Sequence, residues 1–179
     1  MPATTASHLD DVGRVVGGLT QLGLQPVLVG GMAMVTIGSR RVTRGFDFVI
    51  AHPADRLQLF VDLLYARGLE LASRLNDQGD VTATIDNQRV AGIRLRLDAP
   101  LTASFYKAET GLRIDLLFDF PIPAATLAAA ATTTKLRSAL LRVASEADLL
   151  RLKKIAQAGR SAPGDAEDTA FLEARQKAT

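Results

Sequence analysis

The sequence predicts an α+β domain in which helices flank a mixed sheet, followed by a pair of C-terminal helices. Apolar residues recur at three- and four-residue steps near both ends of the chain, as they do in amphipathic helices. In the middle of the chain they alternate with polar residues, as they do in half-buried strands. We therefore expect an α+β domain over residues 1–144 and a helical segment, 145–179, packed on it.

The first third of the chain is predicted to alternate helices with strands. Ser7 is a suitable N-cap for the first helix, and Gly23 follows that helix as a stop. The predicted elements are, in order, a helix over 9–22, a strand over 25–29, a short helix over 32–37, a strand over 46–50 and a helix that Asp55 opens.

The remainder supplies further strands and the two last helices. Strands are predicted over 81–85, 91–97, 112–116 and 140–144, with turns at Asp86-Asn87 and Thr110-Gly111. The charge-free stretch 120–134 is predicted to be a helix plus a flexible connection. Ser145 and Asp148 begin a helix in the manner of a capping box, and a linker over 161–164 leads to a closing helix over 165–174.

Composition excludes several kinds of chemistry. The chain has no cysteine, which excludes thiolate nucleophiles, zinc-thiolate sites and iron-sulfur clusters. Its two histidines, His8 and His52, leave little for an imidazole metal site. Enzyme chemistry would therefore use oxygen ligands and cations. The net charge of +2 is no signature of nucleic-acid binding. No apolar segment is long enough for a membrane helix and the start lacks the pattern of a secretory signal, so we expect a cytoplasmic protein that does not bind membranes.

The candidate site lies between residues 29 and 49. Gly30 and Gly31 end a strand, where backbone N–H groups can approach a phosphate because no Cβ is in the way. Asp47 stands between two phenylalanines and Asp115 between two aliphatic residues, so each carboxylate points away from the apolar side of its strand. If the strands are neighbours, the two carboxylates converge on one point and suit a hard cation such as Mg²⁺.

A basic region follows later in the chain. Residues 135–160 hold seven basic residues against two acids, a local surplus of five. Such a region suits a triphosphate or an RNA backbone, and it is equally consistent with an ordinary solvated basic helix. Arg40, Arg41 and Arg44 form a second group, beside the proposed phosphate position, and one of them is expected to contact phosphate.

These residues resemble the nucleotidyltransferase superfamily of the DNA polymerase β type, and more closely its small bacterial AbiEii-like, toxin-type branch. The resemblance depends on the motif Val29-Gly30-Gly31, a gap over 32–44, the acid Asp47 and a later strand acid, Asp115. Arg41 and Thr43 match an Arg-x-Thr that commonly precedes the acids. Residues 148–156, together with Asp165 and Asp168, resemble the branch's Leu-Lys-x-x-Ala helix and the acidic helix after it.

The resemblance implies a nucleotidyltransferase-like mixed sheet and a role for each matching residue. Asp47 and Asp115 would be catalytic and would hold Mg²⁺ or Mn²⁺. The nucleotide-binding residues would be Gly30, Gly31, Ser39, Arg41, Thr43 and Lys153. The reaction implied is transfer of a nucleoside monophosphate from a nucleoside triphosphate to a transfer-RNA end or a protein hydroxyl. Membership of a toxin-antitoxin pair would add an antitoxin protein as partner.

One position departs from the family pattern. The first acid of the Asp-x-Asp pair should stand at position 45, which is glycine. A lost bridging carboxylate weakens at least one metal site, and Asp119 is the nearby substitute that the sequence offers. Two alternatives therefore stay open: an active transferase, or a catalytically degenerate module that binds nucleotide or another protein. The sequence also leaves open the base, the acceptor, the oligomeric state and whether Gly45 is native or introduced.

Overall fold

The computed structural model describes residues 5–43, 45–159 and 165–178, with the side chains of 5–7 left out. The helices are α1 (Thr5–Gln21), α2 (Gly30–Thr36), the 3-10 helix η1 (Ala54–Arg56), α3 (Leu57–Tyr65), α4 (Gln88–Asp98), α5 (Ala124–Ala130), α6 (Glu146–Gly159) and α7 (Asp165–Lys177). The strands are β1 (Val27–Val29), β2 (Phe46–Ile50), β3 (Glu70–Leu75), β4 (Val81–Ile85), β5 (Thr102–Lys107), β6 (Leu112–Phe118), β7 (Thr132–Leu136) and β8 (Ala139–Val143).

The strands form one mixed sheet in the order β4-β3-β5-β6-β2-β1-β8-β7. β2 runs parallel to β6, and β1 runs parallel to β8, while the other neighbours are antiparallel. The two most central strands, β6 and β2, carry the two predicted acids. This sheet with its flanking helices confirms the α+β class and the mixed sheet expected from the sequence.

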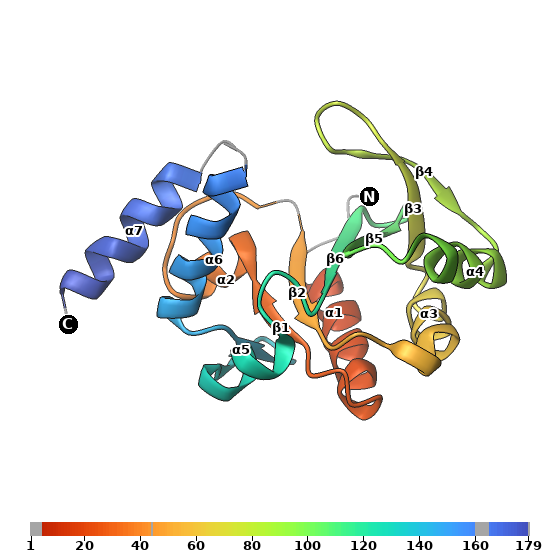
Figure 1. Cartoon of the computed structure of the whole chain (residues 1–179), viewed down its shortest axis with the longest axis horizontal. Helices are drawn as coiled ribbons and strands as arrows, with labels where there is room; N and C mark the ends of the chain where they lie inside the picture. Colours follow the sequence, from red (N-terminus) through yellow and green to blue (C-terminus); the bar gives the residue numbers. More distant parts are fainter. Residues whose placement is uncertain (1–4, 44, 160–164, 179) are drawn as a thin grey trace.

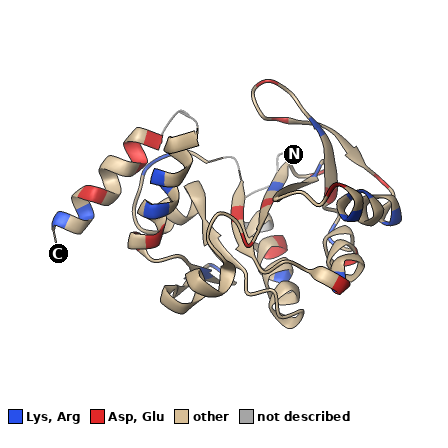
Figure 2. Ribbon diagram, viewed as in Figure 1, with Lys and Arg blue, Asp and Glu red and all other residues tan. Residues whose placement is uncertain are grey.

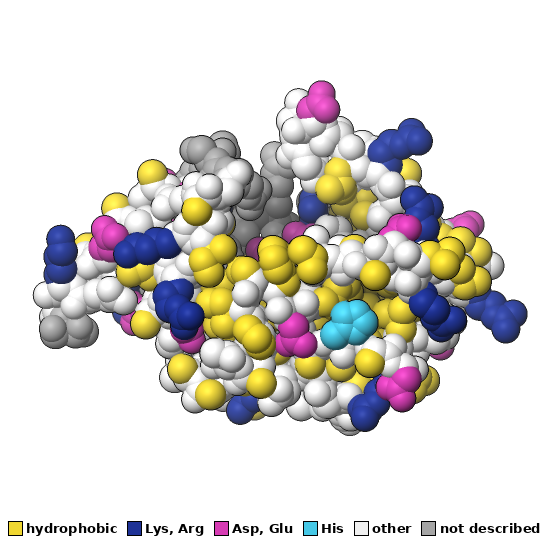
Figure 3. Space-filling model, viewed as in Figure 1, with side chains coloured by type: hydrophobic (Ala, Val, Ile, Leu, Met, Phe, Trp, Pro, Cys, Tyr) yellow, Lys and Arg dark blue, Asp and Glu magenta, His cyan; other side chains and the backbone are white. Residues whose placement is uncertain are grey.

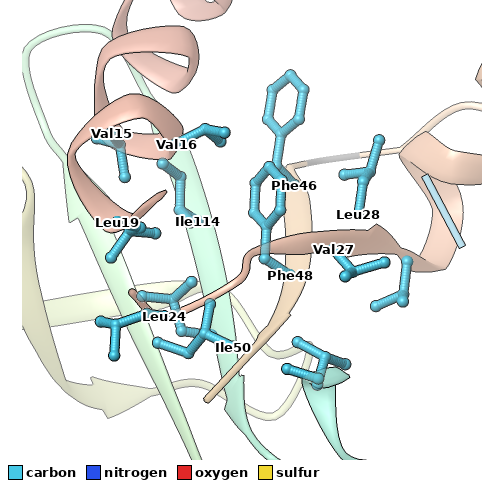
Figure 4. Close-up of a cluster of buried hydrophobic side chains, with 14 of the residues drawn as sticks. Val15, Val16, Leu19, Leu24, Val27, Leu28, Phe46, Phe48, Ile50 and Ile114 are labelled. Atoms are coloured by element: carbon cyan, nitrogen blue, oxygen red, sulfur yellow. The ribbon is translucent and has the colours of Figure 1, made fainter. Parts of the chain in front are cut away.

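The core lies on the sheet face that α1 and α3 cover. Figure 4 shows Val15, Val16 and Leu19 of α1 in one apolar cluster with Ile114 of β6 and with Phe46 and Phe48 of β2. All of these side chains are buried, as expected for apolar residues at helical and alternating spacing. On α3, Phe60 packs edge-on against two sheet residues, Phe105 at 5.7 Å and Phe118 at 5.8 Å between ring centroids.

The two C-terminal helices lie at the end of the molecule opposite to α3, α4 and the β3–β4 hairpin (Figure 1). The hydroxyl of Ser145 accepts a hydrogen bond from the backbone N–H of Asp148 at 3.1 Å, which confirms the predicted cap of α6. Leu172 of α7 is fully buried, and α7 packs against α6. Among the helices of the described ranges, none has the length and apolarity to cross a membrane.

The predicted strand over 91–97 is wrong, because this segment is part of α4. The side chain of Asn87, predicted to lie in a turn, accepts hydrogen bonds from the backbone N–H groups of Arg89 at 3.0 Å and Val90 at 3.1 Å. That cap starts the helix, and its buried residues are spaced as on one helix face: Ala91, Gly92 and Leu95. The alternation of arginine with leucine in this segment favoured a strand, but the cap and the packing determine the helix.

The predicted flexible connection within 120–134 is also wrong at its end. The stretch does contain a helix, α5, but β7 follows it and pairs with β8 from Thr132 to Leu136. β3 and β5 were not predicted either. The linker over 161–164 lies outside the described residues, as do Arg44 and Arg160. The prediction that Ser7 is the N-cap of the first helix is wrong, because α1 begins two residues earlier, at Thr5.

Candidate functional site

Asp47 and Asp115 lie side by side on the open face of the sheet. β2 and β6 pair in parallel register with Asp47 opposite Asp115, flanked by the pairs Phe46 with Ile114 and Phe48 with Leu116. Because side chains alternate along a strand, the apolar neighbours enter the core while both carboxylates point to the other face. The convergence predicted from the two sequence patterns is therefore present.

Proximity and burial change the ionisation of Asp47. Its pKa is raised to about 7, first because burial disfavours the charged carboxylate and second because of the negative charge of Asp115. A hydrogen bond between the two carboxyl groups also favours protonated Asp47. Arg113 and Lys153 act in the opposite direction and lower this pKa. The site thus concentrates negative charge that a bound cation would neutralise.

The two glycines bring the backbone close to Asp47. Gly30 has a φ of +68°, and a Cβ built on it would lie 2.4 Å from Oδ2 of Asp47. A Cβ on Gly31 would lie 2.8 Å from Oγ1 of Thr43 and 3.4 Å from Cζ of Arg41. Position 30 therefore favours glycine both for its backbone conformation and for space, and at position 31 any larger residue would displace the side chain of Thr43. The turn that the sequence predicts is packed directly against the predicted acid.

A cavity of about 660 Å³ opens over these residues. Its polar lining comes from Gly30, Gly31, Arg41, Thr43, Asp47, Thr102, Lys153 and Asp165, and its apolar lining from Val29, Val49, Leu117, Phe120, Pro121, Leu149, Leu152, Ile155 and Ala156. α6 supplies much of the apolar wall. In Figure 3, hydrophobic side chains gather across the middle of the visible face, over α6 and the chain that follows β6. The cavity thus has a polar, charged side and an apolar side, which we call the apolar wall.

An ion-pair cluster joins the loop before β2 to the two C-terminal helices. The carboxylate of Asp168, with 2% of its side chain exposed, contacts the guanidinium of Arg41 and lies 2.7 Å from the Nζ of Lys153. Lys153 also lies 3.4 Å from Oδ1 of Asp165. Figure 2 shows acidic residues along α7 and basic residues on α6. Because the acids of α7 meet these cations, α7 fixes two of the side chains that line the cavity.

Most of the sequence-predicted binding residues converge on this cavity. Gly30, Gly31, Arg41, Thr43, Lys153 and Asp47 line it, and Asp115 lies next to Asp47. Ser39 is not among the described lining residues, and its hydroxyl accepts a hydrogen bond from the backbone N–H of Arg41 at 3.3 Å.

Asp119 does not replace the acid missing at position 45. β6 ends at Phe118, and Asp119 has a φ of +49°. Its carboxylate accepts hydrogen bonds from the backbone N–H of His52 at 3.1 Å and from that of Ala124, the first residue of α5, at 2.9 Å. Asp119 therefore caps a helix away from the acid pair.

Acidic side chains neutralise part of the positive charge of the basic region at 135–160. Besides Lys153, Arg151 lies 3.2 Å from Asp148, and Lys154 lies 3.7 Å from Glu173 of α7. The surplus counted along the sequence is thus partly balanced by acids of the last helix, which the count did not include.

Three features of the site were not found from the sequence. The contacts of Asp168 with Arg41 and Lys153 join segments far apart in the chain. The apolar wall comes from hydrophobic residues of strands, a loop and α6 whose types do not distinguish a cavity wall from a core. The third is Arg113, whose Nε donates to Oδ1 of Asp115 at 3.0 Å. The Arg-Ile-Asp spacing was the signal available for it, because residues two apart on a strand share a face.

The donor set fits one hard divalent cation. Two carboxylates, together with phosphate oxygens and water, are a common ligand set for Mg²⁺. Within the described residues, no group of three or more histidine, cysteine, aspartate or glutamate side chains is placed to hold a metal ion. A pair of cations clamped by bridging carboxylates needs more ligands than Asp47 and Asp115 supply.

Comparison of the sequence with protein families and with curated proteins found no match. Solved structures with the same fold do exist. The lincosamide antibiotic adenylyltransferase LnuA, lincomycin-bound, is 12% identical with a TM-score of 0.55 over 97% of this chain and 98% of its own. An antigenic nucleotidyltransferase-like protein from Paracoccidioides brasiliensis is 16% identical with a TM-score of 0.59 over 96% and 78%. The antibiotic-resistance factor ANT(2'')-Ia is 12% identical with a TM-score of 0.52 over 98% and 94%. At these identities the likeness establishes the fold, which is that of nucleotidyltransferases.

Proposed function

We propose that this chain binds a nucleoside triphosphate with a divalent cation and transfers the nucleoside monophosphate to a hydroxyl group, releasing pyrophosphate. The observation that carries the proposal is the contact between the Gly30 turn and Asp47 inside a cavity that also contains Lys153. A close backbone turn, an acid pair and a cation are what phosphoryl chemistry requires of a protein. The fold shared with an adenylyltransferase supports the same reaction class.

The phosphates would lie against the polar side of the cavity. Gly30 and Gly31 leave the backbone accessible there, and Arg41, Thr43 and Lys153 supply charge and a hydroxyl. Asp168 holds the two cationic side chains in place through its ion pairs. A phosphate contact by Ser39 would need a movement of its loop toward the cavity.

Asp47 and Asp115 would hold Mg²⁺ or Mn²⁺. The cation would neutralise phosphate charge and polarise the phosphorus toward the acceptor hydroxyl. Both carboxylates must be ionised to bind it, and the pKa of Asp47 near 7 makes that step dependent on pH in the physiological range. Lys153 and Arg113 favour the ionised form of Asp47.

The apolar wall would hold the base or an apolar part of the acceptor. Leu149, Leu152 and Ile155 of α6 line the cavity together with Phe120 and Pro121, and such surfaces suit planar or aliphatic groups. A transfer-RNA end and a protein hydroxyl are the acceptors that the family resemblance suggests. A small hydroxyl-bearing molecule is a third class, since LnuA is described with lincomycin bound. Assignment to the AbiEii-like toxin branch, with an antitoxin partner, is part of the same proposal.

A second candidate function is a catalytically degenerate nucleotide-binding or protein-interaction module, and Gly45 favours it. A Cβ at position 45 would lie 2.5 Å from the backbone oxygen of Arg113, so this backbone has no room for an acidic side chain there. One of the two cation sites used by two-metal transferases then lacks its bridging ligand. Such a protein would bind triphosphate without turnover, or would bind a protein in its place.

The direct test incubates the chain with each α-labelled nucleoside triphosphate, Mg²⁺ and three acceptor pools: transfer RNA, cell protein and hydroxylated antibiotics. The proposal expects label in one pool, with loss of transfer in Asp47→Asn and normal transfer in Asp55→Asn, an exposed acid on η1. Triphosphate binding without any transfer would favour the degenerate module. Absence of binding as well would leave only the protein-interaction role.

A further inference from the structure

Arg113 places a fixed positive charge beside the acid pair. It precedes Asp115 by two residues on β6, so both side chains lie on the same face of the sheet. Its Nε donates to Oδ1 of Asp115 at 3.0 Å, and one terminal nitrogen lies 3.3 Å from Oγ of Ser104 on β5. The other terminal nitrogen donates to the backbone oxygen of Gly79, in the turn between β3 and β4. Three parts of the sheet thus hold a side chain that is 21% exposed.

Gly45 makes room for the backbone that carries Arg113. A Cβ on Gly45 would lie 2.5 Å from the backbone oxygen of Arg113 and 3.2 Å from its Cβ. Positions 45 and 113 therefore face each other one pair before Phe46 and Ile114, and two before Asp47 and Asp115. A larger residue at position 45 would push the backbone of β6 away from position 45 at Arg113.

The charge balance of this face follows from these contacts. Asp47 and Asp115 contribute two negative charges when ionised, and Arg113 contributes one positive charge, because a guanidinium does not lose its proton in proteins. The remaining charge suits one divalent cation shared with phosphate oxygens. A second divalent cation would need the carboxylate of Asp115 as a ligand and would be repelled by the guanidinium of Arg113 bound there.

We propose that Arg113 is a positioning residue that orients Asp115 and stands in for a second cation, so that the site binds one divalent ion. This inference rests on the proposed function, because the ion is the one expected to accompany the triphosphate. It deepens that proposal by giving the stoichiometry of the cation and the residue that determines it.

The test counts Mn²⁺ ions bound to the full chain by electron paramagnetic resonance, without nucleotide, in the wild type and in Arg113→Gln, Arg113→Lys and Asp47→Asn. We expect one ion in the wild type and loss of that ion in Asp47→Asn. Removing the neighbouring charge in Arg113→Gln should tighten Mn²⁺ binding by about three- to tenfold, while Arg113→Lys should stay within about twofold. Arg89→Gln, an exposed arginine of α4, is the matched control and should not change binding.

Several outcomes would overturn the inference. Two Mn²⁺ ions in the wild type would contradict the stoichiometry while leaving the proposed function intact. Weaker Mn²⁺ binding in Arg113→Gln and in Arg113→Lys would show that Arg113 only maintains the structure. If the wild type bound neither Mn²⁺ nor any nucleoside triphosphate, the proposed function would fail and the inference with it.

Discussion

Asp47 on β2 and Asp115 on β6 stand opposite each other in parallel register, where burial and the negative charge of Asp115 raise the pKa of Asp47. Two acids held this close at a partly buried position do not both ionise readily near neutral pH. In the absence of a cation the pair therefore retains a proton, and binding of a cation would release it. The acid pair is a site whose charge state depends on what it binds.

The stability of the cation-free protein should fall as the pH rises between about 4 and 7. The pKa of Asp47 is about 7 in the fold against 3.8 as the ordinary value, so in this window the unfolded chain has lost a proton that the folded chain keeps. Asp47→Asn removes this effect. As the pH rises from 4 to 8, we expect the Tm of the variant to increase by about 2–4 °C relative to that of the wild type. This shift corresponds to about 1 kcal/mol of unfolding free energy, after allowing for solvent screening.

Thermal unfolding in EDTA at several pH values measures this difference. Asp55→Asn, at an exposed position, should follow the wild type throughout. Parallel pH profiles for the wild type and Asp47→Asn would contradict the raised pKa.

Gly30→Ala should destabilise the protein and disrupt the site. The new Cβ would lie 2.4 Å from Oδ2 of Asp47 on a backbone with a φ of +68°. We expect a loss of about 2–4 kcal/mol in urea unfolding, from the left-handed backbone together with the overlap. Gly111→Ala separates the two causes, because Gly111 has a φ of +78° and open space around it. It should lose only about 1 kcal/mol, and an equal loss in both variants would rule out the contact with Asp47.

Much of this fold and site could be predicted from the sequence, because the relevant signals are local. The glycine pair, Asp47 between Phe46 and Phe48, and the cap at Ser145 each depend on a few neighbouring residues. The convergence of Asp47 and Asp115 was predicted on the condition that their strands are neighbours, and the parallel pairing of β2 with β6 meets that condition.

The rest depends on contacts between distant segments. The helix α4 was mistaken for a strand because Arg and Leu alternate there, whereas its cap at Asn87 and its packing against α3 determine the helix. The ion pairs of Asp168 with Arg41 and Lys153 could not be predicted, since residues 41 and 168 meet only through the packing of α7.

Asp168→Asn should be the most destabilising change in the ion-pair cluster. Asp168 is almost fully buried and forms ion pairs with both Arg41 and Lys153. Removing its negative charge leaves these two largely buried cations without the carboxylate that balances them both. We expect a loss of about 3 kcal/mol in chemical unfolding. Glu173→Gln is the matched control, because Glu173 pairs with Lys154 at 3.7 Å on the surface. Its cost should stay below about 1 kcal/mol, and a similar cost at Asp168 would mean that the cluster adds little to stability.

Restoring an acid at position 45 should not restore a second cation site. Gly45→Asp and Gly45→Ala should both lose about 1–3 kcal/mol of stability, because each adds a Cβ that would lie 2.5 Å from the backbone oxygen of Arg113. Gly17→Ala, on α1 with open space around it, should instead gain about 0.5–1 kcal/mol. Tighter cation binding by Gly45→Asp, at unchanged stability, would refute the steric account.

Triphosphate binding tests the account most directly. Calorimetric titration with each of the four nucleoside triphosphates, as non-hydrolysable analogues with Mg²⁺, measures whether the Gly30–Asp47 cavity is a nucleotide site. We predict binding of at least one analogue, one per chain and dependent on Mg²⁺. Asp47→Asn should weaken that binding at least about tenfold, and Asp55→Asn should leave it unchanged. No binding of any analogue, or equal affinity in Asp47→Asn, would contradict the account.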